Sequence, residues 1–461
     1  MLKSLIGDKK FYKHVLVLVI PIFIQNFITN FVNMLDNLMV GKIGQVEMTG
    51  VSVTNQLIFV FNLVIFGAIS GAGIFGAQFV GSGDVKGLRD TFRFKLVSCV
   101  LLTLAACGIF LLFGDTLIHL YLKGEGDVTD AARSLSFGKD YLLIMLIGFI
   151  PYTVSQCYAS TLREKGQTVL PMAAGIAAVC INLFLNWVLI FGNLGAPVLG
   201  VKGAAIATVI SRFVELIIVV LFTHLTSEKN TFIKGAYKSF KIPAALCKNI
   251  IKKGTPLMIN ETMWAAGMAF VAQCYSVRGL DVVAANTITT TFFNVFSVAF
   301  ISLGAAIGII LGQLLGVGKL DEAYDSSKKL IAFSVAVSTL IGGLFALCAS
   351  FIPQFYEVSD EVRELATKLM WVSACIMPLD SFANAAYFTL RSGGQATITM
   401  IFDSGFVWAA FVPVAYILAN FTNVPIIPLY ITVNALTFFK DVLGFIFVKR
   451  KKWLKNIVSE Q

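Results

Sequence analysis

An isolated carboxylate, Asp36, lies in the first long apolar stretch of the chain, residues 14–41. A charge within hydrocarbon is costly, so such a group normally faces a protein cavity, takes a partner or binds a proton. Polar residues precede it at helical steps of four, four and three, in the order Gln25, Thr29, Asn33 and Asp36. This polar face of a helix cannot be turned toward lipid. We therefore predict an ion site or pathway at Asp36, with a buried polar seam that fixes helix packing as the alternative.

A proline lies in the same stretch, at Pro21. Proline lacks the backbone donor and clashes with the preceding turn, so the helix is predicted to kink there and to allow two arrangements. Pro256 occupies a similar place in the second half of the chain. Both prolines are predicted helix kinks.

A second set of polar residues lies in the second half. Glu261 follows Pro256 by five residues, and Asp380, Asn384 and Tyr387 recur at helical steps of four and three. We predict that these four residues line a substrate cleft or a second ion site. The alternative is that each carboxylate is satisfied by neighbouring hydroxyl or amide groups.

Two asparagines and a threonine supply further oxygen atoms in the first half. Asn182 and Asn186 are one helical turn apart, and Thr208 follows the small residues Gly203, Ala204 and Ala205. If these segments pack through their small residues, their oxygens can converge near Asp36. Carboxylate, amide and hydroxyl oxygens suit a hard cation, so the site fits a proton or sodium. Interhelical hydrogen bonding alone is the alternative, and no other metal site is predicted.

The composition defines a membrane protein. The chain has 461 residues, of which 57% are hydrophobic and only 13% charged, whereas soluble domains carry about 25% charged residues. Cutting the apolar stretches at charged or Gly/Pro-rich breaks gives twelve segments of spanning length. We predict an N-lobe at 1–223, a basic cytosolic linker at 224–253 and a C-lobe at 254–461, with six helices in each lobe.

The positive charge is distributed unequally between alternate loops. On one side we count 26 Lys and Arg residues and on the other eight, which leaves Arg212 and Lys440 inside the spans. This bias predicts that both termini are cytoplasmic in a multi-pass protein of the cell (inner) membrane, and it argues against a nucleic-acid partner. Arg212 is predicted to pair with Glu215, and Lys440, beside Asp441, to reach the cytosolic interface.

The chain contains an internal repeat. At a shift of 235, Pro21 matches Pro256 and Thr54 matches Thr289, and the glutamine-glycine motif at 78–83 matches that at 313–318. A unit of six spans inserts twice with the same orientation. The two lobes are therefore predicted to be related by a pseudo-twofold axis along the membrane normal, with alternating access at their interface.

Together these motifs resemble the multidrug and toxic compound extrusion (MATE) family over nearly the whole chain. The resemblance rests on the following residues: Pro21 with Asp36, Gln78-x-x-Gly81-x-Gly83, Gln313-x-x-Gly316-x-Gly318, Leu162-Arg163-x-x-Gly166, Asn182-x-x-x-Asn186, Gly203-Ala204-Ala205, and Asp380 before Leu390-Arg391. It implies an all-α antiporter of twelve transmembrane helices that exports organic cations or amphipathic drugs, with proton or sodium as the coupling ion. It also implies that Asp36 is the ion-coupling residue, together with Asn182, Asn186 and Thr208, and that Asp380 matches a tenth-helix acid. Asn186 stands where one bacterial branch of the family has an aspartate.

These observations predict a transporter that needs no cofactor and works as a monomer in contact with membrane lipid. No phosphate-binding loop, dinucleotide fingerprint or catalytic elbow is found, so an enzyme is not expected. One alternative is a flippase of a lipid-linked precursor, although such an anionic cargo would favour more basic residues in the cleft. The other alternative is a membrane receptor or scaffold that transports nothing.

Overall fold

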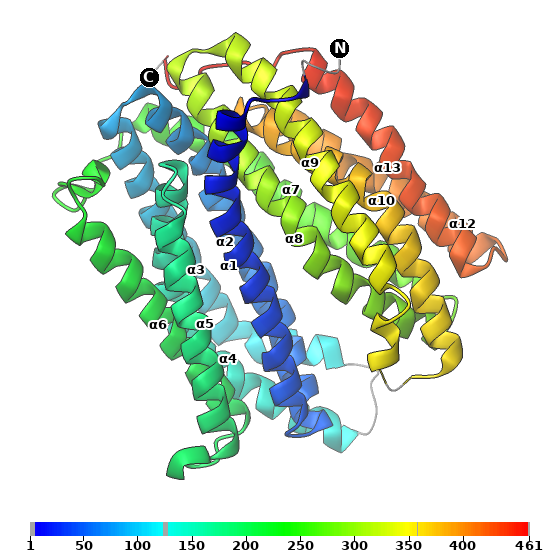
Figure 1. Cartoon of the computed structure of the whole chain (residues 1–461). Coiled ribbons are helices and arrows are strands. Elements are labelled where there is room, and N and C mark those ends of the chain that lie inside the picture. Colours follow the sequence, from blue (N-terminus) through cyan, green and yellow to red (C-terminus); the bar gives the residue numbers. More distant parts are fainter. Residues whose placement is uncertain (1–4, 123–127, 357, 460–461) are drawn as a thin grey trace. The chain divides into compact units, whose positions relative to one another are not determined.

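A computed structural model of the chain describes residues 5–122, 128–356 and 358–459, and within these ranges the regular structure is entirely helical. Ten helices are long and apolar enough to cross a membrane by length and composition, counted over the described residues. Two further helices of 33 residues each, α7 (Ala244–Ser276) and α10 (Asp360–Ser392), complete the predicted number. The predicted all-α membrane fold is confirmed (Figure 1).

The chain divides into two compact units. The N-terminal unit contains Ile24–Gly76 and Asp84–Lys248, and the C-terminal unit contains Met1–Phe23, Ala77–Gly83 and Asn249–Gln461. The boundary passes through the first helix between Phe23 and Ile24, two residues beyond Pro21. The predicted lobe boundaries at 223 and 254 stay predictions.

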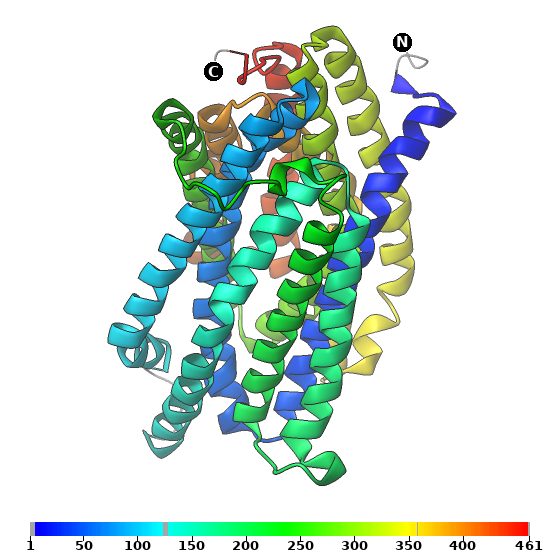
Figure 2. The same ribbon diagram turned by 90° about the vertical axis from the view of Figure 1, so that its left-hand side faces the viewer.

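The first six helices follow one another with short connections. They are α1 (Lys9–Gly41), α2 (Gln45–Ser82), α3 (Val85–Leu122), α4 (Val128–Glu164), α5 (Val169–Phe191) and α6 (Val201–Leu225). Within the N-terminal unit α4 and α5 pack on α6, and α3 packs on α4 (Figure 2). Small residues permit this approach, because a Cβ atom added at Gly203 would lie only 2.6 Å from the Leu189 carbonyl oxygen. The predicted packing of these two spans through small residues is confirmed.

The C-terminal unit is built around α8 (Leu280–Val317), which packs on α10 and on α9 (Leu320–Cys348). The eleventh span, Ala396–Phe421, is irregular. It begins as α11 (Ala396–Met400), widens into the π-helical segments η5 (Ile401–Gly405) and η6 (Val407–Phe411), and ends as α12 (Val412–Phe421). The last helix, α13 (Ile426–Lys449), packs against α10. π-Helical turns are rare and occur frequently at functional sites.

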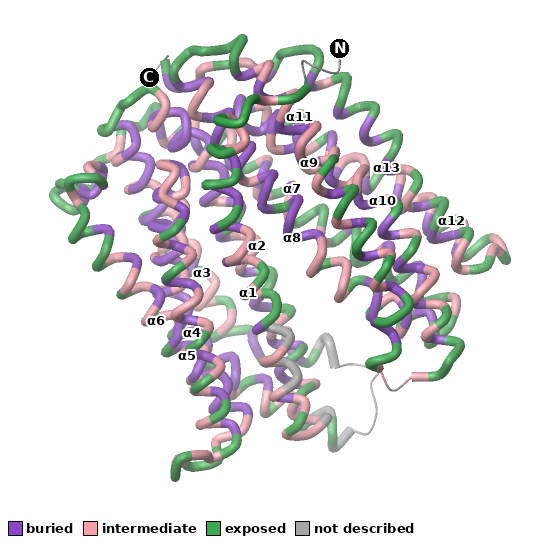
Figure 3. The backbone as a smooth tube through the Cα atoms, viewed as in Figure 1, coloured by how far each residue is buried: buried purple, intermediate pink, exposed green. Residues whose placement is uncertain are grey.

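Each helix has a buried face that packs on other helices and an exposed face that is available to lipid. Figure 3 shows buried and exposed positions alternating along the helices, and large apolar side chains such as Leu112, Leu340 and Phe439 are exposed. Exposed apolar side chains along a helix are expected where the helix contacts lipid. In the C-terminal unit the buried faces meet in a core that also includes the beginning of α1, from Val15 to Ile22.

The internal repeat has structural counterparts. The Thr54 hydroxyl donates to the Gly138 carbonyl at 3.1 Å, and the Thr289 hydroxyl donates to the Ala366 carbonyl at 3.4 Å. These bonds join α2 to α4 and α8 to α10. The duplicated threonine therefore makes the same interhelical contact in both halves.

The duplicated glutamine-glycine motifs pack on each other within the C-terminal unit. A Cβ atom at Gly81 would overlap the Gln313 carbonyl, and one at Gly316 would overlap the Gln78 carbonyl. The ends of α2 and α8 thus cross, and a glycine of each helix lies against the backbone of the other. Only glycine permits two helices to approach this closely.

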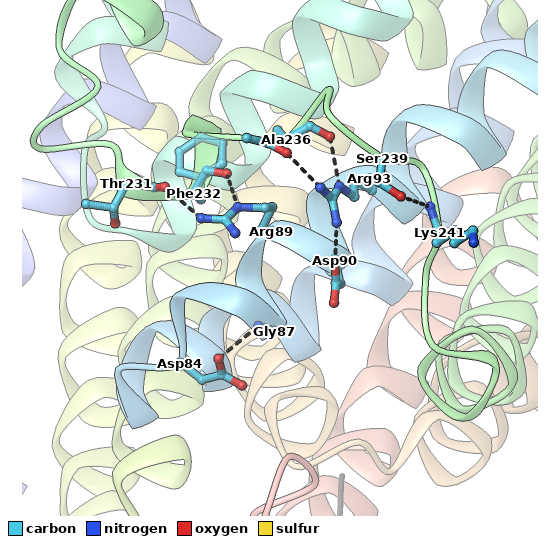
Figure 4. A network of polar contacts seen from close by, with 11 residues as sticks. Asp84, Gly87, Arg89, Asp90, Arg93, Thr231, Phe232, Ala236, Ser239 and Lys241 are labelled. Atoms are coloured by element: carbon cyan, nitrogen blue, oxygen red, sulfur yellow. Dashed lines mark hydrogen bonds and ion pairs between the residues drawn. The ribbon is translucent and has the colours of Figure 1, made fainter.

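The basic segment after α6 is held by arginines of α3. Arg93 donates to the carbonyls of Ala236 at 2.8 Å and Gly235 at 2.7 Å, and Arg89 donates to the Phe232 carbonyl at 3.2 Å (Figure 4). Arg93 also pairs with Asp90 at 2.8 Å. The segment contains the short 3-10 helix η3 (Thr231–Ile233), and α7 already begins at Ala244, within the predicted linker.

Lys95, one of the 26 basic residues counted on the more basic side, is buried between helices and does not lie at the membrane surface. Lys95 is fully buried in α3, where its Nζ atom lies 2.5 Å from Glu164 of α4 and 3.1 Å from the Ser160 hydroxyl. Its count as a loop residue is wrong, because a lysine fixed by a buried carboxylate does not sample the membrane surface. The charge bias between the two sides does not depend on this single residue.

Candidate functional site

The predicted residues around Asp36 lie together in the N-terminal unit. Asp36 is on the second part of α1, Asn182 and Asn186 are on one face of α5, and Thr208 is on α6. The Asn186 amide nitrogen donates to Asp36 Oδ1 at 2.7 Å. The close packing of α5 and α6 places these groups beside one another, as the helical spacing of the two asparagines predicts.

Asn182 lies between Asp36 and Thr208. Its amide is satisfied on both sides when the nitrogen faces Asp36, at 3.0 and 3.1 Å from the two carboxylate oxygens. The amide oxygen then accepts from the Thr208 hydroxyl at 3.2 Å and from its backbone nitrogen at 3.3 Å. This orientation follows from donor and acceptor chemistry, because a carboxylate oxygen can only accept.

One acceptor in this cluster has no donor. The side-chain oxygen of Asn186 is buried and has no hydrogen-bond partner among the described residues, although its nitrogen contacts Asp36. A buried acceptor without a donor is costly. The cluster therefore presents an amide oxygen next to a carboxylate, a combination that fits a bound cation.

Gln25 and Arg212 make other contacts. The Gln25 side-chain oxygen accepts from Arg163 at 2.9 Å, so this residue joins α1 to α4. Arg212 pairs with Glu215 at 3.4 Å as predicted, and its guanidinium lies 4.8 Å from the centre of the Tyr152 ring. The side chain of Asn33, predicted for the Asp36 face, lies outside the described part of the structure.

In the C-terminal unit two of the four predicted residues make a direct contact. The Tyr387 hydroxyl of α10 donates to Glu261 Oε1 of α7 at 2.8 Å. Asn384, one turn away on α10, has a buried side-chain oxygen without a partner in the described residues, and it lies against Gly304 of α8. Asp380 is half-buried on the same helix, near enough to Lys440 for their charges to interact.

The prediction for Lys440 is wrong. Its side chain does not reach the interface: the residue is only 8% exposed, and its Nζ atom lies 2.7 Å from Asp403 Oδ1. The other Asp403 oxygen accepts from the Asn260 amide at 2.9 Å. The reason is tertiary, because α13 packs against the π-helical segment η5 that carries Asp403.

Asp403 was not predicted from the sequence, and Asp441 was noted only as the neighbour of Lys440. Asp403 is a carboxylate within an apolar span, so the rule that singled out Asp36 could have found it. Asp441 is 8% exposed, and neither of its carboxylate oxygens has a hydrogen-bond partner among the described residues. The second half therefore holds more buried charge than predicted. Across the described residues, no group of three or more His, Cys, Asp or Glu side chains is arranged to hold a metal ion.

The fold and these two polar clusters define a class of protein, a helical membrane transporter built from a duplicated unit. The chain belongs to the MatE family, whose model matches residues 21–188 and 256–417. The two matched segments begin at Pro21 and Pro256, which confirms the repeat at a shift of 235. The family consists of multidrug transporters and not enzymes, in agreement with the prediction.

Comparison with individual proteins agrees with this assignment. The chain is 25% identical to the probable multidrug resistance protein NorM of Thermotoga maritima, over 97% of this chain and 94% of that protein. The crystal structure of a MATE transporter in the straight conformation has a TM-score of 0.86 at 18% identity and covers 98% of each chain. The structure in the bent conformation also has a TM-score of 0.86, at 17% identity, and covers 98% of this chain and 97% of that one.

Proposed function

We propose that the protein is a cation-coupled antiporter that exports cationic or amphipathic organic compounds by alternating access. The contact between Asn186 and Asp36 carries the proposal, because it places a carboxylate next to an amide oxygen that has no donor among the described residues. Proton or sodium binding would satisfy both groups. Within this proposal Asp36, Asn182, Asn186 and Thr208 form the ion-coupling site.

The first helix links ion binding to transport. Pro21 lies inside α1, two residues before the division between the compact units, while Asp36 lies beyond that division. Ion binding at Asp36 neutralises its charge and favours a different bend of α1 at Pro21. This differential binding to two states couples the ion to the drug. A MATE transporter of this fold is known in straight and bent conformations, which supports the proposal.

The second-half cluster serves the organic substrate or a second ion. Glu261, Asp380, Asn384 and Tyr387 are its predicted members. Pro256 lies inside α7, where we expect the kink that matches the one at Pro21. Buried carboxylates attract a cationic compound whose own charge compensates theirs. The protein would act as a monomer in the inner membrane, with both termini in the cytoplasm.

The coupling ion is tested with purified protein in vesicles loaded with a fluorescent organic cation. One sample receives a sodium gradient alone and the other a pH gradient alone, at equal membrane potential. We expect one of the two gradients to drive dye movement that protein-free vesicles do not show. Dye movement that is independent of both gradients would contradict the antiport mechanism.

A further inference from the structure

A small cavity lies where α13 ends. It measures about 60 Å³ and lies between the end of α10, the beginning of the eleventh span and the residues that follow α13. Its walls are mainly apolar, formed by Leu390, Ile398, Phe447 and Trp453. Gln395 and two basic side chains, Arg450 and Lys452, complete the lining. All of these residues belong to the C-terminal unit.

Arg450 and Lys452 differ from the basic residues beside them. Lys451 lies over the Tyr324 ring at 4.2 Å and Lys449 over the Phe445 ring at 5.7 Å, so both neighbours have an aromatic partner. Arg450 and Lys452 are exposed and have no acidic or aromatic partner among the described residues. Two positive charges at one apolar cavity are thus available for an anion.

The backbone that carries them is held in place. Trp453 is fully buried, and its indole nitrogen donates to the Val448 carbonyl at 3.1 Å. The Gln395 side chain donates to the Lys452 carbonyl at 3.0 Å. Farther along, Gln78 donates to the Lys455 carbonyl at 3.1 Å. Fixing the chain on both sides of Lys452 reduces the entropy lost when its side chain binds a ligand.

The cavity lies at the end of the last candidate membrane span, where the boundary between hydrocarbon and lipid headgroups is expected. The last candidate membrane span ends at Lys449, one residue before Arg450. On the preceding turn Phe445 and Ile446 are exposed, and Ile401 is exposed on the neighbouring span. An apolar wall therefore lies beside a pair of cations, the arrangement that matches acyl chains beside a phosphate.

We propose that this cavity binds the headgroup of an anionic glycerophospholipid. Arg450 and Lys452 contact the phosphodiester and the anionic headgroup, Phe447 and Ile398 contact the glycerol region, and the acyl chains lie along the exposed face near Phe445. The proposal does not depend on which ion drives transport or on what is exported.

The test uses the full-length protein in detergent with equal amounts of phosphatidylglycerol and phosphatidylcholine, and native mass spectrometry counts the lipids retained. In the wild type we expect phosphatidylglycerol to be retained preferentially. The double variant R450Q/K452Q should reduce that preference roughly tenfold, because each surface cation contributes to binding of an anionic lipid. The control K234Q/K238Q removes the same charge from two exposed lysines of the segment after α6 and should keep the preference.

A competition experiment distinguishes the lipid from a free anion. Inorganic phosphate at millimolar concentration should not displace phosphatidylglycerol, because it cannot use the apolar wall. Complete displacement by phosphate would overturn the proposal in favour of a simple anion site. An unchanged preference in R450Q/K452Q, or an equal loss in K234Q/K238Q, would also overturn it. Thermal unfolding of each variant verifies that the fold is intact.

Discussion

The polar clusters of the two units surround their carboxylates with different groups. In the N-terminal unit a single carboxylate, Asp36, is surrounded by the neutral donors Asn182 and Asn186. In the C-terminal unit Asp403 is neutralised by Lys440, while Glu261 accepts from Tyr387. We propose that an ion from solution compensates the charge of the first cluster, whereas Asp403 of the second cluster is already paired with a lysine.

The two duplicated halves therefore share their helix-packing contacts but not their polar side chains. The glycine crossing and the threonine contacts occur in both copies. At the repeat shift, however, Asp36 corresponds to Val271, which is buried. Close backbone contacts require glycine or another small residue whatever the function of the protein. Polar side chains can change as long as their charge is compensated.

The largest effect is expected from neutralising the first-half acid. D36N should reduce gradient-driven dye export to the level of protein-free vesicles, because no other carboxylate contacts Asn186 in the described residues. Export is measured in vesicles with the effective gradient imposed. The control D115N removes an exposed carboxylate that pairs with Lys139 at 2.6 Å, and it should transport normally. Export by D36N at the wild-type rate would show that the two clusters do not differ in coupling.

The fixed cation of the second half should be needed for stability. K440M leaves the half-buried Asp403 without its counter-charge, so we expect a loss of about 3 to 5 kcal/mol in the free energy of unfolding. The double variant D403N/K440M should recover part of that loss. Unfolding is followed by the exposure of buried cysteines on heating. K139M, which breaks an exposed pair, should change stability by at most about 1 kcal/mol, and an equally small effect for K440M would contradict the comparison.

The shared frame predicts equal effects in the two copies. G81A and G316A each introduce a Cβ atom against a backbone carbonyl, so each should destabilise the protein by about 1 to 3 kcal/mol. G343A is the matched control, because a Cβ atom there meets nothing within 4 Å. Thermal unfolding compares the three variants. A large cost for one motif and none for the other would show that the crossing is not symmetric.

A smaller effect is expected when the first cluster gains charge. N186D places a second carboxylate beside Asp36, so two negative charges instead of one attract the coupling cation and its apparent affinity should rise roughly tenfold. It is measured as the ion concentration that gives half-maximal export. N193D adds the same charge in the loop after α5 and should leave this concentration unchanged. A weaker dependence on the ion in N186D would argue against cation binding at Asp36.

Much of the fold could be predicted from the sequence. Apolar stretches of spanning length define the helices, because an unpaired backbone cannot cross a bilayer. The i, i+4 spacing of Asn182 and Asn186, with the small residues around Gly203, also correctly predicted that the residues of the first cluster lie together. The second cluster was predicted less well. Lys440 was predicted to reach the cytosolic interface, although it pairs with Asp403, which lies 37 residues earlier in the chain.

The sequence by itself determined the membrane class, the duplicated frame and the cost of placing Asp36 in a span, because these follow from composition, periodicity and transfer energies. Only the tertiary structure decided that Lys440 neutralises Asp403 and that the duplicated glycine motifs cross each other. It also decided that Asp441 is buried with no hydrogen-bond partner among the described residues. Such pairings depend on which helix faces meet, and local spacing does not specify that. The packing of α13 against the π-helical segment η5 is a tertiary contact, and it places Lys440 beside Asp403 in the second half.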